Sequence, residues 1–306
     1  MPEVGLLDPA SVRRLAAELD LRPTKQRGQN FVIDPNTVRR IVSLSGVTAD
    51  DVVLEIGPGL GSLTLGLLEL GASVVAVEIE DALAARLGRT ARERLGDDAA
   101  SRLHVVPADA LRVDELPLTP SALVANLPYN VSVPVLLRML ELFPEWTKGL
   151  VMVQLEVADR LAARPGSKVY GVPSAKVAWY ADAARIATVP PKVFWPVPNV
   201  DSGLVRLERR DPPRIELPPP AGTDGAPDPA LVSREATFRV IDAAFGQRRK
   251  MLRASLRPLG PDLDAMLAEA GIDPTERAER VPLEGFCALA RAVTARARAL
   301  ATHAPG

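Results

Sequence analysis

The stretch Asn126-Leu127-Pro128-Tyr129 combines an amide, a rigid turn and an aromatic ring, directly after the apolar run SALVA that is typical of a buried strand. An exocyclic adenine amine is a poor nucleophile because its lone pair is delocalised into the ring. The side-chain oxygen of Asn126 and the backbone carbonyl of Leu127 could accept hydrogen bonds from such a nitrogen, and Pro128 has no N–H to compete with it. The face of Tyr129 could stack on a base, which contributes roughly 1–3 kcal/mol. A tyrosine half-buried in a loop explains this residue equally well.

A second stretch, VLEIGPGLGSLT, places Gly57, Gly59 and Gly61 after a predicted strand and before a predicted helix. Glycine lets a ligand approach the backbone closely, because no Cβ is in the way. A dinucleotide site has the pattern G-x-G-x-x-G, but Ser62 stands at the place of its third glycine. This departure favours a nucleoside cofactor without phosphates, such as S-adenosylmethionine. A tight turn without any ligand is the alternative.

Two acids follow at the ends of the next predicted strands. Glu78 ends the run VVAVE, where an acid can accept hydrogen bonds from both ribose hydroxyls. Asp109 ends VVPAD and is placed to accept a hydrogen bond from an adenine amine. Each acid taken alone is more often a helix N-cap or a solvated loop residue. Ligands of open α/β sheets bind at the carboxyl ends of the strands, so these successive strand ends together predict one site, with Asn126 at the fourth.

The elements that must bring these strand ends together alternate along the chain. Strand candidates are DVVLEIG, SVVAVEIE, LHVVPAD, SALVANLP and GLVMVQ, and helical stretches such as GSLTLGLLELG and DALAARLGRTARERLG separate them. Alternation of this kind predicts parallel βαβ units in a sheet covered by helices on both faces. IATVP and SGLVRLER are later strand candidates, predicted as a terminal hairpin. Two short helices, over 9–19 and from Asp34-Pro35 onward, are expected before the sheet, with a polar, basic arm between them.

A proline-rich segment divides the chain. Residues 211–230 contain seven prolines in twenty residues, which a helix interior does not tolerate. The pattern after about residue 231 is helical to the end. We therefore predict an α/β domain over 1–210, a linker or surface excursion over 211–230 and a small all-α domain over 231–306.

The composition, 47% hydrophobic and 25% charged over 306 residues, is ordinary for a globular protein. The net charge of −1 argues weakly against nucleic acid as a partner. Cys287 is the only cysteine, so no disulfide framework is possible, and a reducing compartment is expected. The N-terminus lacks the pattern of a signal peptide, and no apolar run reaches the ~18 residues of a membrane span. We expect a cytoplasmic protein that binds no membrane and no metal and acts as a monomer.

Five motifs together resemble a known family, the ribosomal RNA adenine N6,N6-dimethyltransferases. The motifs are KQRGQNF, VLEIGPGLGSLT, ANLPYNVS, KVFWPVPNVDSGLVRL and AFGQRRKMLRASL, and they run from Lys25 to Leu256. PNVDS and FGQRRKMLRASL point to the bacterial small-subunit (16S) rRNA branch. The resemblance implies a Rossmann-like S-adenosylmethionine-dependent methyltransferase domain over 1–210 and an RNA-binding domain over 231–306.

The same resemblance implies roles for individual residues. The target base is expected in a pocket formed by residues 126–129, with Phe194 closing opposite Tyr129. Trp195 is not a fixed feature of the family, which leaves open which aromatic ring stacks, and Val32 stands where the family often has leucine. The residues expected to contact the cofactor are Gln29, Asn30, Val32, Glu55, Gly57, Gly59, Glu78, Ile79, Asp109, Ala110 and Asn126.

Two clusters of cations without acids are candidates for RNA contacts. A basic helical face is usually only solvated surface, but the resemblance makes RNA the expected partner, in the form of the small ribosomal subunit or its assembly intermediate. Phosphate contacts of this kind weaken steeply with salt. The candidate residues are Arg22, Lys25 and Arg27 in the arm and Arg248, Arg249, Lys250, Arg253 and Arg257 in the helical domain.

Rival functions are open at this stage. A related dimethyltransferase acting on one large-subunit rRNA adenine would give macrolide resistance, and a non-catalytic RNA-binding or transcription factor could use the same fold. A glutamine or small-amine methyltransferase could also use an N-x-P-Y loop. The chain contains only His104 and His303, and neither lies in a motif. That absence of a strong base fits methyl transfer driven by a sulfonium leaving group and by positioning.

Overall fold

The structure is a computed structural model that describes residues 4–21, 30–211 and 233–302. Several predicted residues lie outside this described part. They are Arg22, Lys25 and Arg27 of the arm, the cofactor candidate Gln29 and nearly all of the proline-rich segment.

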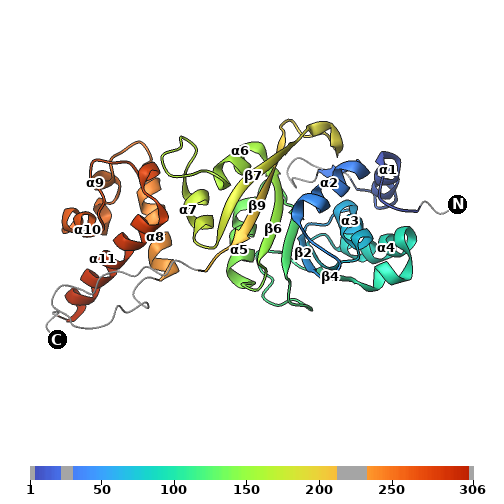
Figure 1. The fold of residues 1–306 in the computed structure, drawn as a ribbon, viewed down its shortest axis with the longest axis horizontal. Helices are drawn as coiled ribbons and strands as arrows, with labels where there is room; N and C mark the ends of the chain where they lie inside the picture. The colour runs from blue at the N-terminus through green and yellow to red at the C-terminus, as the bar shows by residue number, and fades with distance from the viewer. Residues whose placement is uncertain (1–3, 22–29, 212–232, 303–306) are drawn as a thin grey trace. The chain divides into compact units, whose positions relative to one another are not determined.

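A seven-stranded, mostly parallel sheet organises the first part of the chain (Figure 1). Its order is β4-β3-β2-β5-β6-β9-β7, and β6 pairs with β9 antiparallel while β4, β3, β2, β5 and β6 run parallel. The strands are β2 (Val52–Ile56), β3 (Ser73–Glu78), β4 (Leu103–Pro107), β5 (Ala122–Asn126), β6 (Lys148–Gln154), β7 (Ala181–Val189) and β9 (Ser202–Arg209). The predicted α/β architecture is confirmed. The predicted pairing of the two late strands is confirmed, since β9 lies between β6 and β7 and is a neighbour of both.

Six helices of the described residues belong to this region or border it. The first two begin where an aspartate side chain accepts a backbone N–H and a proline follows: Asp8 caps α1 and Asp34 caps α2. The helices are α1 (Pro9–Glu18), α2 (Pro35–Ser45), α3 (Ser62–Leu70), α4 (Asp81–Ser101), α5 (Ser132–Leu142) and α6 (Leu155–Leu161).

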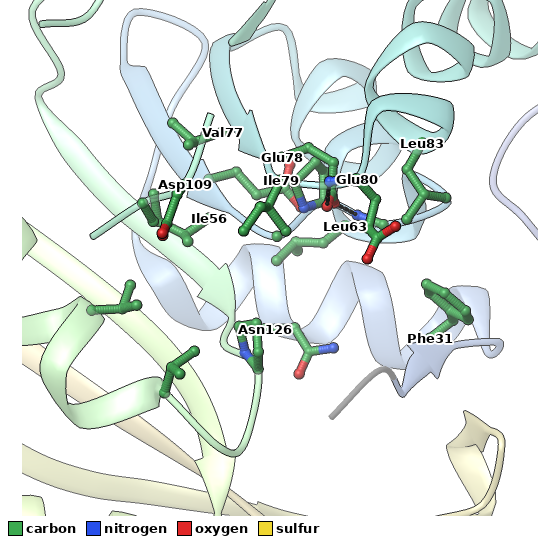
Figure 2. A pocket seen from close by; sticks show the side chains of 18 of the residues that line it. Phe31, Ile56, Leu63, Val77, Glu78, Ile79, Glu80, Leu83, Asp109 and Asn126 are labelled. Atoms are coloured by element: carbon green, nitrogen blue, oxygen red, sulfur yellow. Dashed lines mark hydrogen bonds between the residues drawn. The ribbon is translucent and has the colours of Figure 1, made fainter. Parts of the chain in front are cut away.

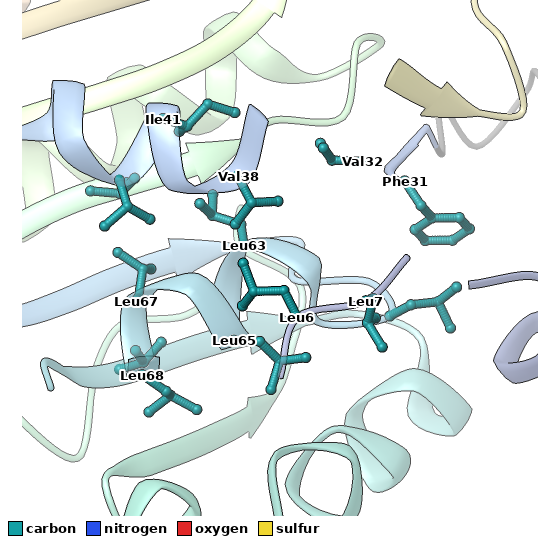
Figure 3. Close-up of a cluster of buried hydrophobic side chains, with 14 of the residues drawn as sticks. Leu6, Leu7, Phe31, Val32, Val38, Ile41, Leu63, Leu65, Leu67 and Leu68 are labelled. Carbon is teal, nitrogen blue, oxygen red and sulfur yellow. The ribbon is translucent and has the colours of Figure 1, made fainter. Parts of the chain in front are cut away.

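Helices α1 to α4 bury an apolar cluster against one face of the sheet (Figure 3). Side chains alternate between the two faces of a strand, so Val74 and Ala76 of β3 join this cluster, whereas Val75 and Val77 are buried on the other face. A sheet that is apolar on both faces requires helices on both. The continuous apolar runs in the sequence reflect this double burial.

A two-stranded pairing was not predicted. β1 (Phe31–Val32) and β8 (Phe194–Trp195) pair antiparallel, with Phe31 opposite Trp195 and Val32 opposite Phe194. The ring of Phe31 stacks on that of Trp195, with 6.4 Å between centroids. The pairing brings together two sequence motifs that are far apart in the chain, since Phe31 pairs with Trp195 and Val32 with Phe194.

The second compact unit contains only helices and loops within the described residues. It comprises residues 160–181 and 211–306, so α7 (Val172–Ala178) groups with the C-terminal helices although it precedes β9. A single domain boundary at residue 210 therefore does not describe residues 160–181, which group with the second unit. The remaining elements are α8 (Arg234–Gly246), α9 (Leu252–Ser255), α10 (Leu263–Glu269), α11 (Leu283–Thr302) and the 3-10 turns Arg257–Leu259 and Ala278–Arg280.

None of the helices described here is long and apolar enough to span a membrane.

Candidate functional site

A cavity of about 370 Å³ lies at the carboxyl ends of β2, β3, β4 and β5 (Figure 2). Its volume falls within the roughly 300–1,000 Å³ that small-molecule sites occupy. In Figure 2, Asn126 lies on the opposite side of the cavity from Glu78 and Ile79. The sequence-predicted residues that line it are Asn30, Val32, Glu55, Gly57, Gly59, Glu78, Ile79, Asp109, Ala110, Asn126 and Pro128. The structure thus brings together the strand ends that the sequence singled out.

The glycine turn between β2 and α3 needs its glycines. Gly57, Gly59 and Gly61 have φ of 68°, 59° and 96°, a region that other L residues rarely adopt. A Cβ on Gly59 would lie 2.6 Å from Cε1 of Phe31, closer than real contacts allow. The turn is therefore specific for glycine, and Phe31 is the side chain packed directly on it.

Ser62 has a role that the sequence did not reveal. Its hydroxyl donates to the Val32 carbonyl at 2.6 Å, which ties the start of α3 to β1. In a dinucleotide fingerprint a third glycine at this place allows close packing. Here the serine hydroxyl holds the residues around Asn30 and Val32 against the cavity.

Glu78 is a buried acid that shapes the cavity wall. Its Oε2 accepts the Gly59 N–H at 3.0 Å and its Oε1 accepts the Glu80 N–H at 3.0 Å. Burial raises the pKa of Glu78, and these backbone hydrogen bonds oppose the rise. Each carboxylate oxygen has a second lone pair, so Glu78 can still accept hydrogen bonds from a ligand.

Glu55 lies deeper, near the end of β2, and is 1% exposed. Burial raises its pKa to about 8, while a hydrogen bond from the Thr64 hydroxyl, at 2.7 Å, opposes the rise. The nearby charge of Glu78 adds to the rise. Without a bound cation, Glu55 is therefore mostly protonated at neutral pH. Asp109 is more open, and its Oδ1 accepts the Leu111 N–H at 2.9 Å.

The loop after β5 is held at three points. The Asn126 amide nitrogen donates to the Asn30 carbonyl at 2.9 Å. The side-chain oxygen accepts no hydrogen bond within the described residues. The Leu127 N–H donates to the Met152 carbonyl at 3.0 Å. Pro128 lies over the glycine turn, since a Cβ on Gly57 would be 3.5 Å from the proline ring. Asn126 therefore presents a fixed oxygen acceptor at the cavity.

The two aromatic candidates for the target base differ in position. Tyr129 is half-buried, and its hydroxyl lies 2.7 Å from the Ser202 hydroxyl at the start of β9. Phe194 is 0% exposed, because β8 pairs with β1 and directs this ring into the apolar cluster. Neither residue lines the cavity. The role of Phe194 as the ring that closes opposite Tyr129 stays a prediction, and in this structure its ring is buried in the apolar cluster.

Sequence reasoning missed several apolar lining residues. Phe31, Leu63, Leu83, Leu111, Val131 and Val135 also face the cavity. Their positions follow from the pairing of β1 with β8 and from the packing of α3, α4 and α5, for which a single sequence contains no local signal. No group of three or more His, Cys, Asp or Glu side chains is placed to hold a metal ion within the described residues.

The predicted RNA-binding cations of the second unit fall into two groups. Arg249, Lys250, Arg253 and Arg257 are exposed and form no ion pair within the described residues. Arg248 differs, because its guanidinium donates to the Lys168 and Tyr170 carbonyls and lies 3.6 Å from Glu279. The structure does not present Arg248 as a free phosphate contact.

Comparisons with known proteins agree with this geometry. The family model for ribosomal RNA adenine dimethylase matches residues 21–217. A Ribosomal RNA small subunit methyltransferase A from Cutibacterium acnes is 60% identical over 303 residues, covering 98% of this chain and 97% of its own. The protein of the same name from Streptomyces griseus subsp. griseus is 56% identical, covering 94% of each chain.

Solved structures show the same fold. The 23S rRNA methyltransferase ErmE has a TM-score of 0.60 and 27% identity, covering 86% of this chain and 99% of its own. A dimethyladenosine transferase from Plasmodium falciparum has a TM-score of 0.64 and 21% identity, covering 84% and 94%.

The fold and the cavity define a Rossmann-like S-adenosylmethionine-dependent methyltransferase. The residues present fit that cofactor, since a glycine turn, two buried acids and apolar walls suit a cationic nucleoside. The chain belongs to the ribosomal RNA adenine dimethylase family.

Proposed function

We propose that this enzyme dimethylates the N6 amines of two adjacent adenosines in small-subunit (16S) rRNA during ribosome biogenesis. The observation that carries the proposal is the fixed acceptor oxygen of Asn126 at a cavity lined by the predicted cofactor residues. We infer the identity of the RNA substrate from the relatives, which are named for the small subunit and match nearly the whole chain.

The chain's own residues supply positioning. The Asn126 oxygen and the Leu127 carbonyl would accept hydrogen bonds from the target amine, which favours a pyramidal nitrogen with an available lone pair. Tyr129, held by Ser202, would stack on the base after it leaves the RNA stack. When bound, S-adenosylmethionine supplies a methyl group on a positively charged sulfur that departs as a neutral thioether. Such a step depends on orientation more than on a strong base.

The cofactor would be held by residues at the carboxyl ends of β2, β3 and β4. Glu78 and Asp109 would accept hydrogen bonds from its hydroxyl and amine groups, and the glycine turn would let it approach the backbone. The RNA would be held by Arg249, Lys250, Arg253 and Arg257 in the second unit and by Arg22, Lys25 and Arg27, which lie outside the described residues. Phe194 stays a candidate only if β8 rearranges, because its ring is fully buried.

The test uses purified protein, labelled S-adenosylmethionine, and small and large subunits from a strain that lacks this modification. Digestion and mass spectrometry should locate paired dimethyladenosines in small-subunit rRNA. Asn126→Ala should reduce turnover about 100-fold or more, the size expected when one fixed hydrogen-bond partner of a transition state is removed. Asn36→Ala, an exposed amide on α2, is the matched control and should keep full activity.

Other outcomes would select the rival functions. Label confined to the large subunit would support the rival resistance-type enzyme; the similar structure ErmE is a 23S rRNA methyltransferase. Cofactor binding without label in either subunit would point to another amine substrate. Absence of cofactor binding would favour a non-catalytic RNA-binding factor.

The proposal includes a monomeric enzyme that needs no metal and acts in the cytoplasm, where ribosomal subunits assemble. Light scattering checks the oligomeric state. Retention of activity in a chelator checks the independence from metal.

A further inference from the structure

A short loop in the second unit, residues 164–170, is fastened to the rest of that unit more tightly than an ordinary connection. The Gly166 N–H donates to the Glu279 carbonyl at 2.6 Å. The Arg248 guanidinium donates to the Lys168 carbonyl and, at 2.9 Å, to the Tyr170 carbonyl. Three residues of the loop, Gly166, Lys168 and Tyr170, are thus attached through backbone groups.

Arg248 links this loop to the segment that follows α8. The guanidinium lies 3.6 Å from the Glu279 carboxylate as well, so one side chain joins the loop, the end of α8 and the turn at Ala278–Arg280. The Tyr170 ring is 2% exposed and packs on Phe245 of α8, with 6.0 Å between centroids. The loop therefore has one defined position relative to α8.

The fastened loop nevertheless presents a cation to solvent. Lys168 is exposed, and its ammonium has no ion-pair partner within the described residues. Because its own carbonyl is bound by Arg248, Lys168 lies next to the start of the segment that carries the exposed cations Arg249 and Lys250. Loop and segment together form one basic surface.

The charges around this surface favour an anion. The acids on the neighbouring segment are Asp273, Glu276 and Glu279, and Glu279 already faces Arg248. Arg277 and Arg280 lie on the same segment and offset the others. Surface arginines elsewhere are largely paired, as Arg39 is with Glu69 and Arg89 with Glu93. An exposed cation on a backbone that is already held in place suits a phosphate, since less backbone freedom is lost on binding.

We propose that residues 164–170 form an RNA-contacting loop, in which Lys168 binds a backbone phosphate and Arg248 is the positioning residue that holds the loop. The inference rests on the proposed function and deepens it, because it adds a segment outside the C-terminal helices to the RNA surface. It also gives Arg248 a structural task in place of a direct phosphate contact.

The experiment measures binding of the full-length protein to unmodified small subunits over a range of salt concentrations. Lys168→Ala should weaken binding several-fold and reduce the slope of log affinity against log salt by about 0.7–0.9, the loss of one phosphate contact. Lys168→Arg should restore both. Cofactor affinity should stay unchanged. Arg13→Ala removes an exposed cation of α1 that has no ion-pair partner in the described part of the chain, and it should leave subunit binding unchanged.

The positioning role of Arg248 is tested by the rate of tryptic cleavage in the loop, which the loss of a phosphate contact would not change. Arg248→Ala should release the loop and speed tryptic cleavage after Lys168, since Pro165 protects the bond after Arg164. Lys168→Arg keeps a cleavable bond at this position, and there the cleavage should stay slow. The double variant should bind subunits no more weakly than Arg248→Ala alone, because both act through one contact.

Two results would overturn the inference in distinguishable ways. If Lys168→Ala binds subunits as Arg13→Ala does while Arg249→Ala binds weakly, the loop makes no RNA contact and the proposed function stands. If wild-type protein neither binds nor methylates the subunits, the proposed function itself fails, and the loop inference fails with it.

Discussion

Two acids at opposite ends of β2, Asp51 just before the strand and Glu55 near its end, differ in protonation. Asp51 precedes the strand and accepts hydrogen bonds from Lys148 Nζ at 2.9 Å, the Thr48 N–H at 2.7 Å and the Ser121 hydroxyl at 2.7 Å. Burial opposes ionisation, but these partners hold the pKa of Asp51 at about 2. Glu55, four residues on, has one hydroxyl partner, and burial raises its pKa to about 8.

This difference in pKa distinguishes two ends of the sheet. The amino ends of the strands stabilise the fold, and the carboxyl ends form the candidate cofactor site. At the amino ends of the strands, each polar group of the Asp51 network has a partner from the chain itself. At the carboxyl ends, glycines in left-handed conformations and under-compensated acids surround a cavity. Buried acids without cationic partners are costly, and such groups cluster at functional sites. A cationic ligand would offset that cost.

The largest expected effect comes from the glycine turn. Gly59→Ala places a Cβ 2.6 Å from Phe31 Cε1 in a backbone with φ of 59° and should displace the N–H that holds Glu78. We expect the dissociation constant for S-adenosylmethionine to rise about 1,000-fold, equivalent to ~4 kcal/mol, measured by calorimetry.

Gly46→Ala is the matched control at the other end of the sheet. Gly46 also has a positive φ, 68°, but nothing lies within 4 Å of an added Cβ. Backbone strain of about 1 kcal/mol should lower stability only, with cofactor affinity unchanged. Equal losses of affinity in both variants would show that the two ends are not functionally distinct.

Glu55→Gln tests whether the raised pKa of Glu55, at the carboxyl end of β2, makes stability depend on pH. In the wild type the folded pKa of about 8 exceeds the ordinary 4.5, so the folded state retains a proton that the unfolded state loses. The acid's contribution to stability is therefore complete below pH 4.5 and lost as pH rises toward 8, at up to about 1.4 kcal/mol per pH unit.

The variant should remove most of this slope and be relatively more stable at neutral pH than at pH 5. Urea unfolding of the cofactor-free protein between about pH 5 and 7.5 measures the difference. Glu115→Gln, an exposed acid after β4, should keep the wild-type slope. A Glu55→Gln slope equal to that of the wild type would mean that Glu55 is ionised in the folded protein.

Much of the sheet and of the candidate site at its carboxyl edge could be predicted from the sequence, because both depend on local patterns. Apolar runs that end in glycine or an acid predict buried parallel strands, and the carboxyl ends of such strands share one edge. That reasoning predicts one site for Gly57, Glu78, Asp109 and Asn126, and the structure brings all four to the cavity.

What could not be predicted depends on contacts between distant segments. Phe194 belongs to a motif expected at the target base, but its pairing with Val32 buries the ring. Arg248 belongs to a run of cations, but its guanidinium donates a hydrogen bond to the carbonyl of Lys168, 80 residues earlier in the chain. The amide orientation of Asn126 likewise depends on the carbonyl of Asn30. None of these pairings leaves a periodic signal in the chain.

Asp51→Asn should have the smallest effect, confined to stability. The folded pKa of about 2 lies below the ordinary 3.8, so this carboxylate stabilises the fold above pH 3.8, and the contribution is lost as pH falls through about 2. The shift corresponds to about 2 kcal/mol at neutral pH. Asn cannot accept the same set of hydrogen bonds and leaves the Lys148 ammonium unpaired. We expect wild type and variant to differ most at pH 7 and to converge toward pH 2, with the cofactor dissociation constant the same in both. A change in cofactor affinity of tenfold or more would mean that the paired end of β2 is coupled to the cavity, and the two ends would then have to be treated as one site.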